Sequence, residues 1–155
     1  MPTVKQLAAK LNKSATENLI RNVRVMPDDK ASWMPLDAGR SELDQLQECA
    51  IITGFTIYTL TNHALPPDFN EAFEREKPEI DTLDKAVARM EERCAKLCET
   101  IENLPDADLD ITVKLPWMEE PSSLAELMFM TYWNTVYHLG QVNYIQTLYG
   151  DKDMH

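Results

Sequence analysis

Four polar side chains interrupt an apolar stripe in the C-terminal part of the chain, between residues 121 and 149. The stripe follows alternating spacings of three and four residues and consists of Leu124, Leu127, Thr131, Asn134, His138, Gln141, Ile145 and Leu148. This spacing places all of them on one face of an α-helix. Because buried polar groups are costly without partners, we expect a hydrogen-bond network, a metal ion or a water-filled pocket opposite the polar ones.

Asn134 and His138 have the spacing of two metal ligands on one helix. Residues four positions apart project from the same helical face, about one turn from each other, and helices present two ligands to a metal in this way. The neutral amide oxygen of asparagine suits harder cations than zinc. A buried histidine whose hydrogen bonds are satisfied by neighbouring helices is the other interpretation, and the spacing alone leaves both open.

Cys94 and Cys98 are also four residues apart, on the apolar face of a helix expected over residues 79–103. Cysteine is a common small core residue, and no further thiol or histidine is adjacent in the sequence, so core packing is the favoured interpretation. Cys49 makes the number of cysteines odd. Because residues 1–14 lack the apolar centre of a signal peptide, we expect reduced thiols and a cytoplasmic location.

The charge balance narrows the classes of partner. The chain has 155 residues, with 15 basic and 26 acidic side chains and a formal net charge of −11. Nucleic acids and anionic membrane surfaces require a basic face, so neither is expected as a partner. No stretch approaches the roughly 20 apolar residues of a membrane span. A small-molecule ligand remains compatible, because the potential inside a pocket can differ from the net charge.

Hydrophobic periodicity predicts four helices, over residues 3–24, 41–61, 79–103 and 121–149. Thr3 and Ser41 are the expected caps of the first two. The stretch 51–60 is rich in β-branched residues and could form a strand, but the helical period continues through it from Leu43, which favours helix. Residues 62–78 are expected to hold a short helical turn, and residues 111–117 could be extended.

Four helices without a convincing sheet predict an all-α fold, a four-helix bundle that forms a single domain over residues 1–155. The connections are long, about 16 residues each, which permits crossovers and an up-up-down-down arrangement. Large apolar residues surround the start of the last helix on several sides, namely Met128, Phe129, Met130, Tyr132 and Trp133. Such a helix is either central in the bundle or in contact with a second subunit, so we expect a homodimer.

Two sequence pieces give the chain its resemblance to a known family. They are the loop with Trp33, Pro35, Gly39 and Ser41, and the segment His138-Leu-Gly-Gln141. With these pieces the chain resembles the DinB-like, or YfiT-like, superfamily of four-helix-bundle enzymes, over essentially its whole length. The resemblance implies a metal triad that consists of three histidines in the family, one from the second helix and two from the last.

Transferred to this chain, the family triad becomes Glu48, Asn134 and His138, so only one histidine is retained. A shift of one residue in the second helix would place Gln47 or Cys49 at the position of Glu48. The resemblance further implies a divalent metal, zinc or nickel, held more weakly than by three imidazoles. His138 would be a ligand, and Glu48 a ligand or base. Gln141 would orient the ligands without contacting the metal itself.

The resemblance leaves two functional readings. The first is a metal-dependent hydrolase or a transferase that uses a low-molecular-weight thiol, because a divalent metal lowers the pKa of a thiol or water. The second is a dimeric bundle without catalysis, a binding or stress-response protein in which the polar residues form only a buried network. Both readings predict a small-molecule ligand or a protein partner rather than nucleic acid.

Overall fold

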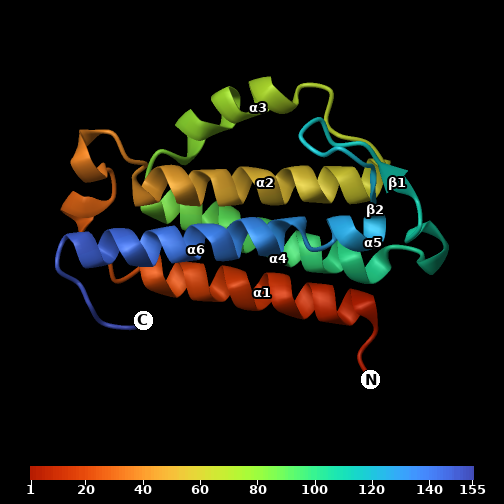
Figure 1. The fold of residues 1–155 in the computed structure, drawn as a ribbon, viewed down its shortest axis with the longest axis horizontal. Coiled ribbons are helices and arrows are strands. Elements are labelled where there is room, and N and C mark those ends of the chain that lie inside the picture. The colour runs from red at the N-terminus through yellow and green to blue at the C-terminus, as the bar shows by residue number, and fades with distance from the viewer.

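The computed structural model describes all 155 residues and is built from four long helices. These are α1 (Val4–Val23), α2 (Glu42–Asn62), α4 (Leu83–Asn103) and α6 (Met130–Leu148), and they pack side by side along their lengths (Figure 1). The shorter elements are α3 (Phe69–Glu76), α5 (Leu124–Leu127), β1 (Thr112–Val113) and β2 (Ser122–Ser123). The all-α four-helix bundle expected from the sequence is confirmed.

Helix α1 is flanked by α4 and α6, and so is α2, so that α1 and α2 lie diagonally opposite each other. Two hydrogen bonds show that α1 and α6 run in the same direction. Asn12 Nδ2 donates to the carbonyl of Met128 just before α6, whereas Gln146 near the end of α6 donates to the carbonyl of Asn22. The first and last long helices therefore form one parallel pair.

Helices α2 and α4 form the second parallel pair, since Gln47 near the start of α2 donates to the carbonyl of Ile80 just before α4. The chain returns between them along the outside of the bundle, through α3 (Figure 1). A long crossover is thus present, but the directions of the helices are up, down, down and up. The expected up-up-down-down order was wrong because the connection from α1 to α2 forms two 3₁₀ turns at one end and does not return along the bundle.

Side-chain caps set the helix starts. Thr3 accepts from the backbone N–H of Gln6 and Ser41 from that of Asp44, as the sequence predicts. The last helix begins later than expected, at Leu124, where Ser123 forms a capping box with Glu126, and it is interrupted between α5 and α6. The β-branched stretch 51–60 is helical throughout. None of the helices is long and apolar enough to cross a membrane.

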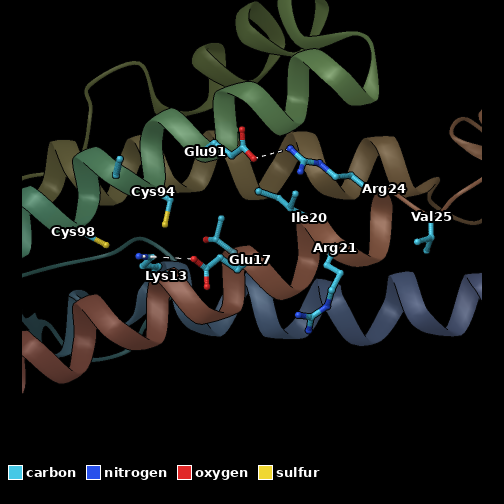
Figure 2. A pocket seen from close by; sticks show the side chains of 11 residues that line it. Lys13, Glu17, Ile20, Arg21, Arg24, Val25, Glu91, Cys94 and Cys98 are labelled. Atoms are coloured by element: carbon cyan, nitrogen blue, oxygen red, sulfur yellow. Dashed lines mark hydrogen bonds and ion pairs between the residues drawn. The ribbon is translucent and has the colours of Figure 1, made fainter. Parts of the chain in front are cut away.

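A layer of buried polar side chains crosses the bundle between two apolar clusters. Leu19, Leu46 and Met90 belong to one cluster, and Leu97 and Leu124 to the other. Along each helix the residues between the clusters are buried and largely polar or thiol-bearing; they are Asn12, Thr16, Thr56, Thr59, Cys94, Thr131, Thr135 and His138. The largest cavity, about 670 Å³, lies beside this layer between α1 and α4 (Figure 2). The polar middle of the last helix is therefore part of a layer to which all four long helices contribute.

Candidate functional site

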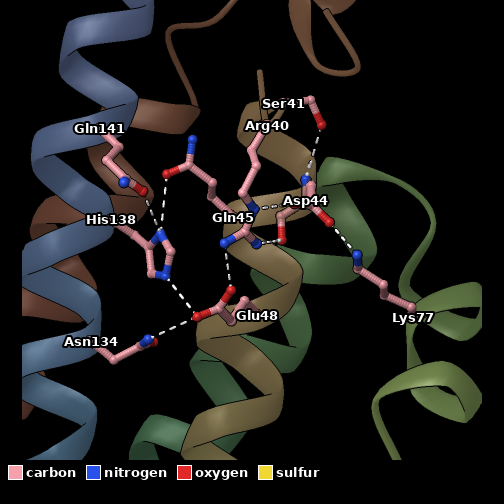
Figure 3. A network of polar contacts seen from close by, with 9 residues as sticks. All are labelled: Arg40, Ser41, Asp44, Gln45, Glu48, Lys77, Asn134, His138 and Gln141. Carbon is pink, nitrogen blue, oxygen red and sulfur yellow. Dashed lines mark hydrogen bonds and ion pairs between the residues drawn. The ribbon is translucent and has the colours of Figure 1, made fainter. Parts of the chain in front are cut away.

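The polar residues of α6 meet α2 around a single imidazole ring (Figure 3). His138 is almost completely buried, with 1% of its surface exposed. Its Nε2 atom lies 2.9 Å from Glu48 Oε1. Its Nδ1 atom lies 3.1 Å from Gln45 Oε1 and 2.9 Å from Gln141 Oε1. Both ring nitrogens therefore face oxygen atoms that accept hydrogen bonds.

This arrangement determines which nitrogen of His138 carries a proton. With the two amides oriented as in the structure, only an N–H at Nδ1 can bond to Gln45 and Gln141. The neutral ring then has a lone pair at Nε2, which faces a carboxylate oxygen of Glu48. Two electron-rich atoms at 2.9 Å repel each other unless a positive centre lies between them. The pair therefore requires a second ring proton or a bound cation.

Glu48 is ionised and held by three side chains. Oε1 contacts His138 and accepts from Asn134 Nδ2 at 3.2 Å, while Oε2 pairs with Arg40 Nη1 at 2.6 Å. The hydrogen bond from His138 is the main cause that lowers the pKa of Glu48 to about 2, and Arg40 adds to this effect against the opposing effect of burial. The site thus contains a carboxylate that is ionised near neutral pH beside the ring of His138.

Arg40 and Gln45 are site residues that the sequence did not single out. Arg40 precedes the cap of α2 and forms ion pairs with Asp44 and Glu48, and Asp44 also pairs with Lys77. Arg40 lies four residues before Asp44 and eight before Glu48, so the basic side chain and the two acidic ones fall on one face of the helix. This spacing is the signal that could have shown Arg40 beside Glu48. Gln45 becomes visible only once α2 and α6 are aligned.

All four polar residues of the predicted stripe have partners. Thr131 donates to Thr56 at 2.8 Å, and the other three join the network around Glu48. The buried face of α6 is nevertheless rotated from the predicted one. Thr135 and Val142 are fully buried, because α6 packs against both α1 and α2 and is covered over a wider surface than the stripe. Leu148, at the end of the helix, is 48% exposed.

The position of Glu48 opposite His138 distinguishes it from its two neighbours in the sequence. Gln47 points toward α4, where Nε2 donates to the carbonyl of Ile80 at 2.9 Å. Cys49 is fully buried in the apolar core, and burial raises the pKa of its thiol. Of the three alternatives, only the Glu48 side chain contacts Asn134 and His138.

A cavity of about 470 Å³ opens beside this network. It shares Arg40, Gln45 and Gln141 with the site. Its other walls are mainly aromatic and aliphatic and include Pro35, Tyr137, Tyr144, Ile145 and Leu148. A few polar groups at one side of an apolar pocket are typical of sites that bind small molecules.

Glu48, Asn134 and His138 offer three donor atoms that could hold a divalent cation. Asn134 Oδ1 is buried without a hydrogen-bond partner, and rotation of the amide would turn it toward Glu48. Two ligands at right angles on an ion, each at about 2.1 Å, lie about 3 Å apart, close to the 2.9 Å between His138 Nε2 and Glu48 Oε1.

The donor set is weaker than an established metal centre. No group of three or more His, Cys, Asp or Glu side chains is arranged to hold a metal, so the third ligand would have to be the Asn134 amide. The guanidinium of Arg40, bound to the second oxygen of Glu48, opposes a further positive charge. The residues fit a divalent cation that is bound weakly.

The fold and the site define a class of four-helix bundles with a polar centre between the second and last long helices. The chain belongs to the DinB superfamily, whose family model matches residues 11–142. A search of curated proteins gives no match.

Solved structures share the fold at low sequence identity. YfiT from Bacillus subtilis, described as a probable metal-dependent hydrolase with an unusual four-helix bundle topology, is 16% identical with a TM-score of 0.77; the match covers 94% of this chain and 87% of YfiT. A mycothiol-dependent maleylpyruvate isomerase is 14% identical with a TM-score of 0.67, over 92% of this chain and 63% of the isomerase. The chain therefore spans less than two thirds of that enzyme.

Proposed function

We propose that this DinB superfamily protein binds a divalent cation through Glu48, Asn134 and His138, and that it is a hydrolase or a thiol-dependent transferase. The observation that carries the proposal is the approach of His138 Nε2 to the ionised Glu48 while Nδ1 is held by two amide oxygens. The names of the two structural neighbours support metal or thiol chemistry in general. Zinc and nickel are the ions proposed from the family resemblance.

Each residue of the site has a distinct part in this proposal. Gln45 and Gln141 accept from Nδ1 and so keep the Nε2 lone pair directed at the cation position, as hydrogen-bonded partners of ligand histidines commonly do. Glu48 supplies the negative charge, and its ion pair with Arg40 favours the ionised carboxylate. A bound divalent cation would lower the pKa of a thiol or water and polarise an electrophile.

The cavity beside the site would hold the substrate. Its apolar walls would bury part of a small organic molecule, and Arg40, Gln45 and Gln141 present polar groups to it. Arg40 is 44% exposed in its side chain and can leave Glu48 to bind an anionic group of the substrate. We also propose the cytoplasm as the location of the protein.

Metal analysis of the purified protein tests the proposal. Isothermal titration with Zn²⁺ or Ni²⁺ is expected to give one site in the wild type, lost in His138→Ala and retained in His63→Ala, whose ring lies at the C-terminal end of α2. Retention of the site in His138→Ala, or no binding at micromolar metal in any of the proteins, contradicts the proposal.

One observation favours the second candidate, a dimeric binding protein without catalysis. Arg40 already neutralises Glu48 at 2.6 Å, so the network is nearly complete without a cation. Trp133, Tyr137 and Tyr144 are each more than 60% exposed on α6, which supports the proposed homodimer. Under this candidate, Tyr137→Glu converts a dimer to a monomer in sedimentation experiments, and added metal leaves the melting temperature unchanged.

A further inference from the structure

The largest cavity of the protein lies on the opposite edge of the bundle from the His138 site, between α1 and α4. Its volume is about 670 Å³, and it is open to solvent. Figure 2 shows the side chains of Cys94 and Cys98 on α4 directed toward α1 across this space. Neither thiol takes part in the site around Glu48, so the pair is free to serve another function.

The two thiols differ in their surroundings. Cys98 is partly exposed and its thiol donates to the carbonyl of Ala9, with the sulfur 3.6 Å from the oxygen. Cys94 is 6% exposed, and the neighbouring Cys98 thiol is the main cause that lowers the pKa of Cys94 below its usual range. A lowered pKa increases the share of thiolate in the pair, and the thiolate is the reactive form of cysteine.

A buried hydroxyl beside these thiols has no partner. Thr16 lines the same cavity, is only 2% exposed, and its Oγ1 atom makes no hydrogen bond. A buried polar atom without a partner is costly, so a ligand held by the thiols that also accepts from or donates to this hydroxyl would gain stability from it.

The charges around the cavity restrict the kind of ligand. Lys13, Arg21 and Arg24 line it together with Glu17 and Glu91, which gives three cations and two anions in a chain whose net charge is −11. Arg24 and Glu91 pair at 2.8 Å and partly neutralise each other. Lys13 and Glu17 also pair, at 3.9 Å, so Arg21 is the one cation of the lining without an acidic partner. The cavity therefore has no unpaired carboxylate to bind a bare divalent ion, which favours a neutral ligand that binds sulfur.

We propose that Cys94 and Cys98 form a dithiol site that binds trivalent arsenic. Side chains four residues apart on a helix have Cβ atoms about 5–6 Å apart, which lets two sulfurs bind one atom without unfolding the helix. Arsenous acid reacts with the two thiols to form two As–S bonds and releases two water molecules, each from one hydroxyl and one thiol proton. The third hydroxyl stays on arsenic, within the cavity that Thr16 lines, and no oxidation state changes.

The apolar walls of the cavity should make the affinity depend on the third substituent of the arsenic atom. Ile20, Val25 and Ala95 supply apolar surface around the thiols. An aryl group on arsenic in place of the third hydroxyl would bury part of its surface there, so a phenyl arsenical should bind about tenfold more tightly than arsenous acid or better.

Intact-mass measurement of the folded full-length protein with phenylarsine oxide tests this site. One oxide reacts with two thiols to give two As–S bonds and one water, so the wild type is expected to gain one phenylarsenic group per chain. Cys94→Ala and Cys98→Ala should each lose the adduct, while Cys49→Ala retains it because Cys49 is isolated in the core. Circular dichroism before and after addition verifies that the protein remains folded.

A substitution that fills the cavity tests whether the cavity contributes to binding or whether the two thiols alone account for it. Ala95 is exposed on α4 and lines the cavity, so Ala95→Phe should fill the space and leave both cysteines intact. The preference for phenylarsine oxide over arsenous acid is expected to disappear in this variant. The proposal is overturned if the folded wild type gains no adduct, if a single cysteine variant retains it, or if Ala95→Phe keeps the preference.

Discussion

His138 Nε2 on α6 and Glu48 Oε1 on α2 lie 2.9 Å apart, with the ring almost completely buried and the carboxylate half-buried. Gln45 and Gln141 occupy the other ring nitrogen, so the contact depends on a positive centre between the ring and Glu48. Whether that centre is a proton or a divalent cation decides between the two proposed functions. Substitution of the groups around the pair should therefore change the affinity for the cation.

Arg40→Ala is expected to raise the affinity for zinc or nickel. The guanidinium lies 2.6 Å from Glu48 Oε2, so its positive charge opposes a cation on the other oxygen of the same carboxylate. At this range, even a strongly screened repulsion corresponds to roughly a tenfold or greater change in affinity. Isothermal titration of metal into the two proteins measures the change.

Lys77→Ala is the control for this experiment. Lys77 is also a cation near α2, but it pairs with Asp44 and does not contact Glu48. An affinity that rises equally in both variants would reflect the general charge of the region, and an unchanged affinity in Arg40→Ala would contradict the position assigned to the cation.

Replacement of either glutamine behind His138 is expected to weaken metal binding. Gln45→Leu and Gln141→Leu each remove one acceptor of the Nδ1 hydrogen, so the ring is freer to place its proton on Nε2. Partners of this kind are worth about tenfold or more in metal affinity. Gln47→Leu, a neighbour in α2 that bonds to the Ile80 carbonyl instead, should leave the affinity unchanged.

Glu48 is expected to make the stability of the metal-free protein dependent on pH in the acid range. Its pKa falls from an ordinary 4.5 to about 2 on folding, so the stabilisation is complete above pH 4.5 and is lost as the pH falls from there through about 2. Since Glu48 is half-buried, we expect a contribution of about 1–2 kcal/mol to the free energy of unfolding.

Urea unfolding at several pH values between 2 and 7 measures this contribution. Glu48→Gln should lower the free energy of unfolding at pH 7 and flatten its decrease toward low pH, whereas Glu120→Gln, on the exposed loop before β2, should behave as wild type. Equal pH profiles for Glu48→Gln and wild type would show that the contact with His138 does not stabilise the fold.

The helices were predictable because their signals are local. Thr3 and Ser41 cap helices within reach of their own neighbours, and the helical period overrode the β-branched composition of residues 51–60. The interruption between α5 and α6 carried no such signal, since the residues around it are good helix formers. The order of helix directions could not be predicted either, because connections of similar length can return along the bundle or turn at its end.

The candidate site was predictable only in part, for a related reason. The periodicity of α6 showed that Asn134, His138 and Gln141 required polar partners, and the family resemblance pointed to Glu48. The contribution of Gln45 depends on the register of α2 against α6, which local patterns do not contain. The contact of Arg40 with Glu48 had a local signal in the four-residue spacing of Arg40, Asp44 and Glu48, but a charged residue in front of a helix is ordinarily solvated, so this signal was not used.

Glu42 should be the most destabilising ionisable residue of the fold. It is fully buried at the start of α2, and neither carboxylate oxygen has a hydrogen-bond partner. Burial is the main cause that raises its pKa from 4.5 to about 8, with a further contribution from the charge of Asp151. Because the pKa of Glu42 is raised on folding, its unfavourable contribution to stability is absent below pH 4.5 and grows as the pH rises from there through about 8.

Glu42→Gln removes this titration and is expected to stabilise the protein by roughly 2–4 kcal/mol at pH 8 and by much less at pH 5. The amide keeps the shape of the protonated acid and carries no charge to bury. Glu71→Gln, at an exposed position of α3, provides the comparison, and its free energy of unfolding should match that of the wild type at both pH values. A Glu42→Gln protein that is less stable than wild type at pH 8 would mean that the ionised carboxylate has a cationic partner in solution.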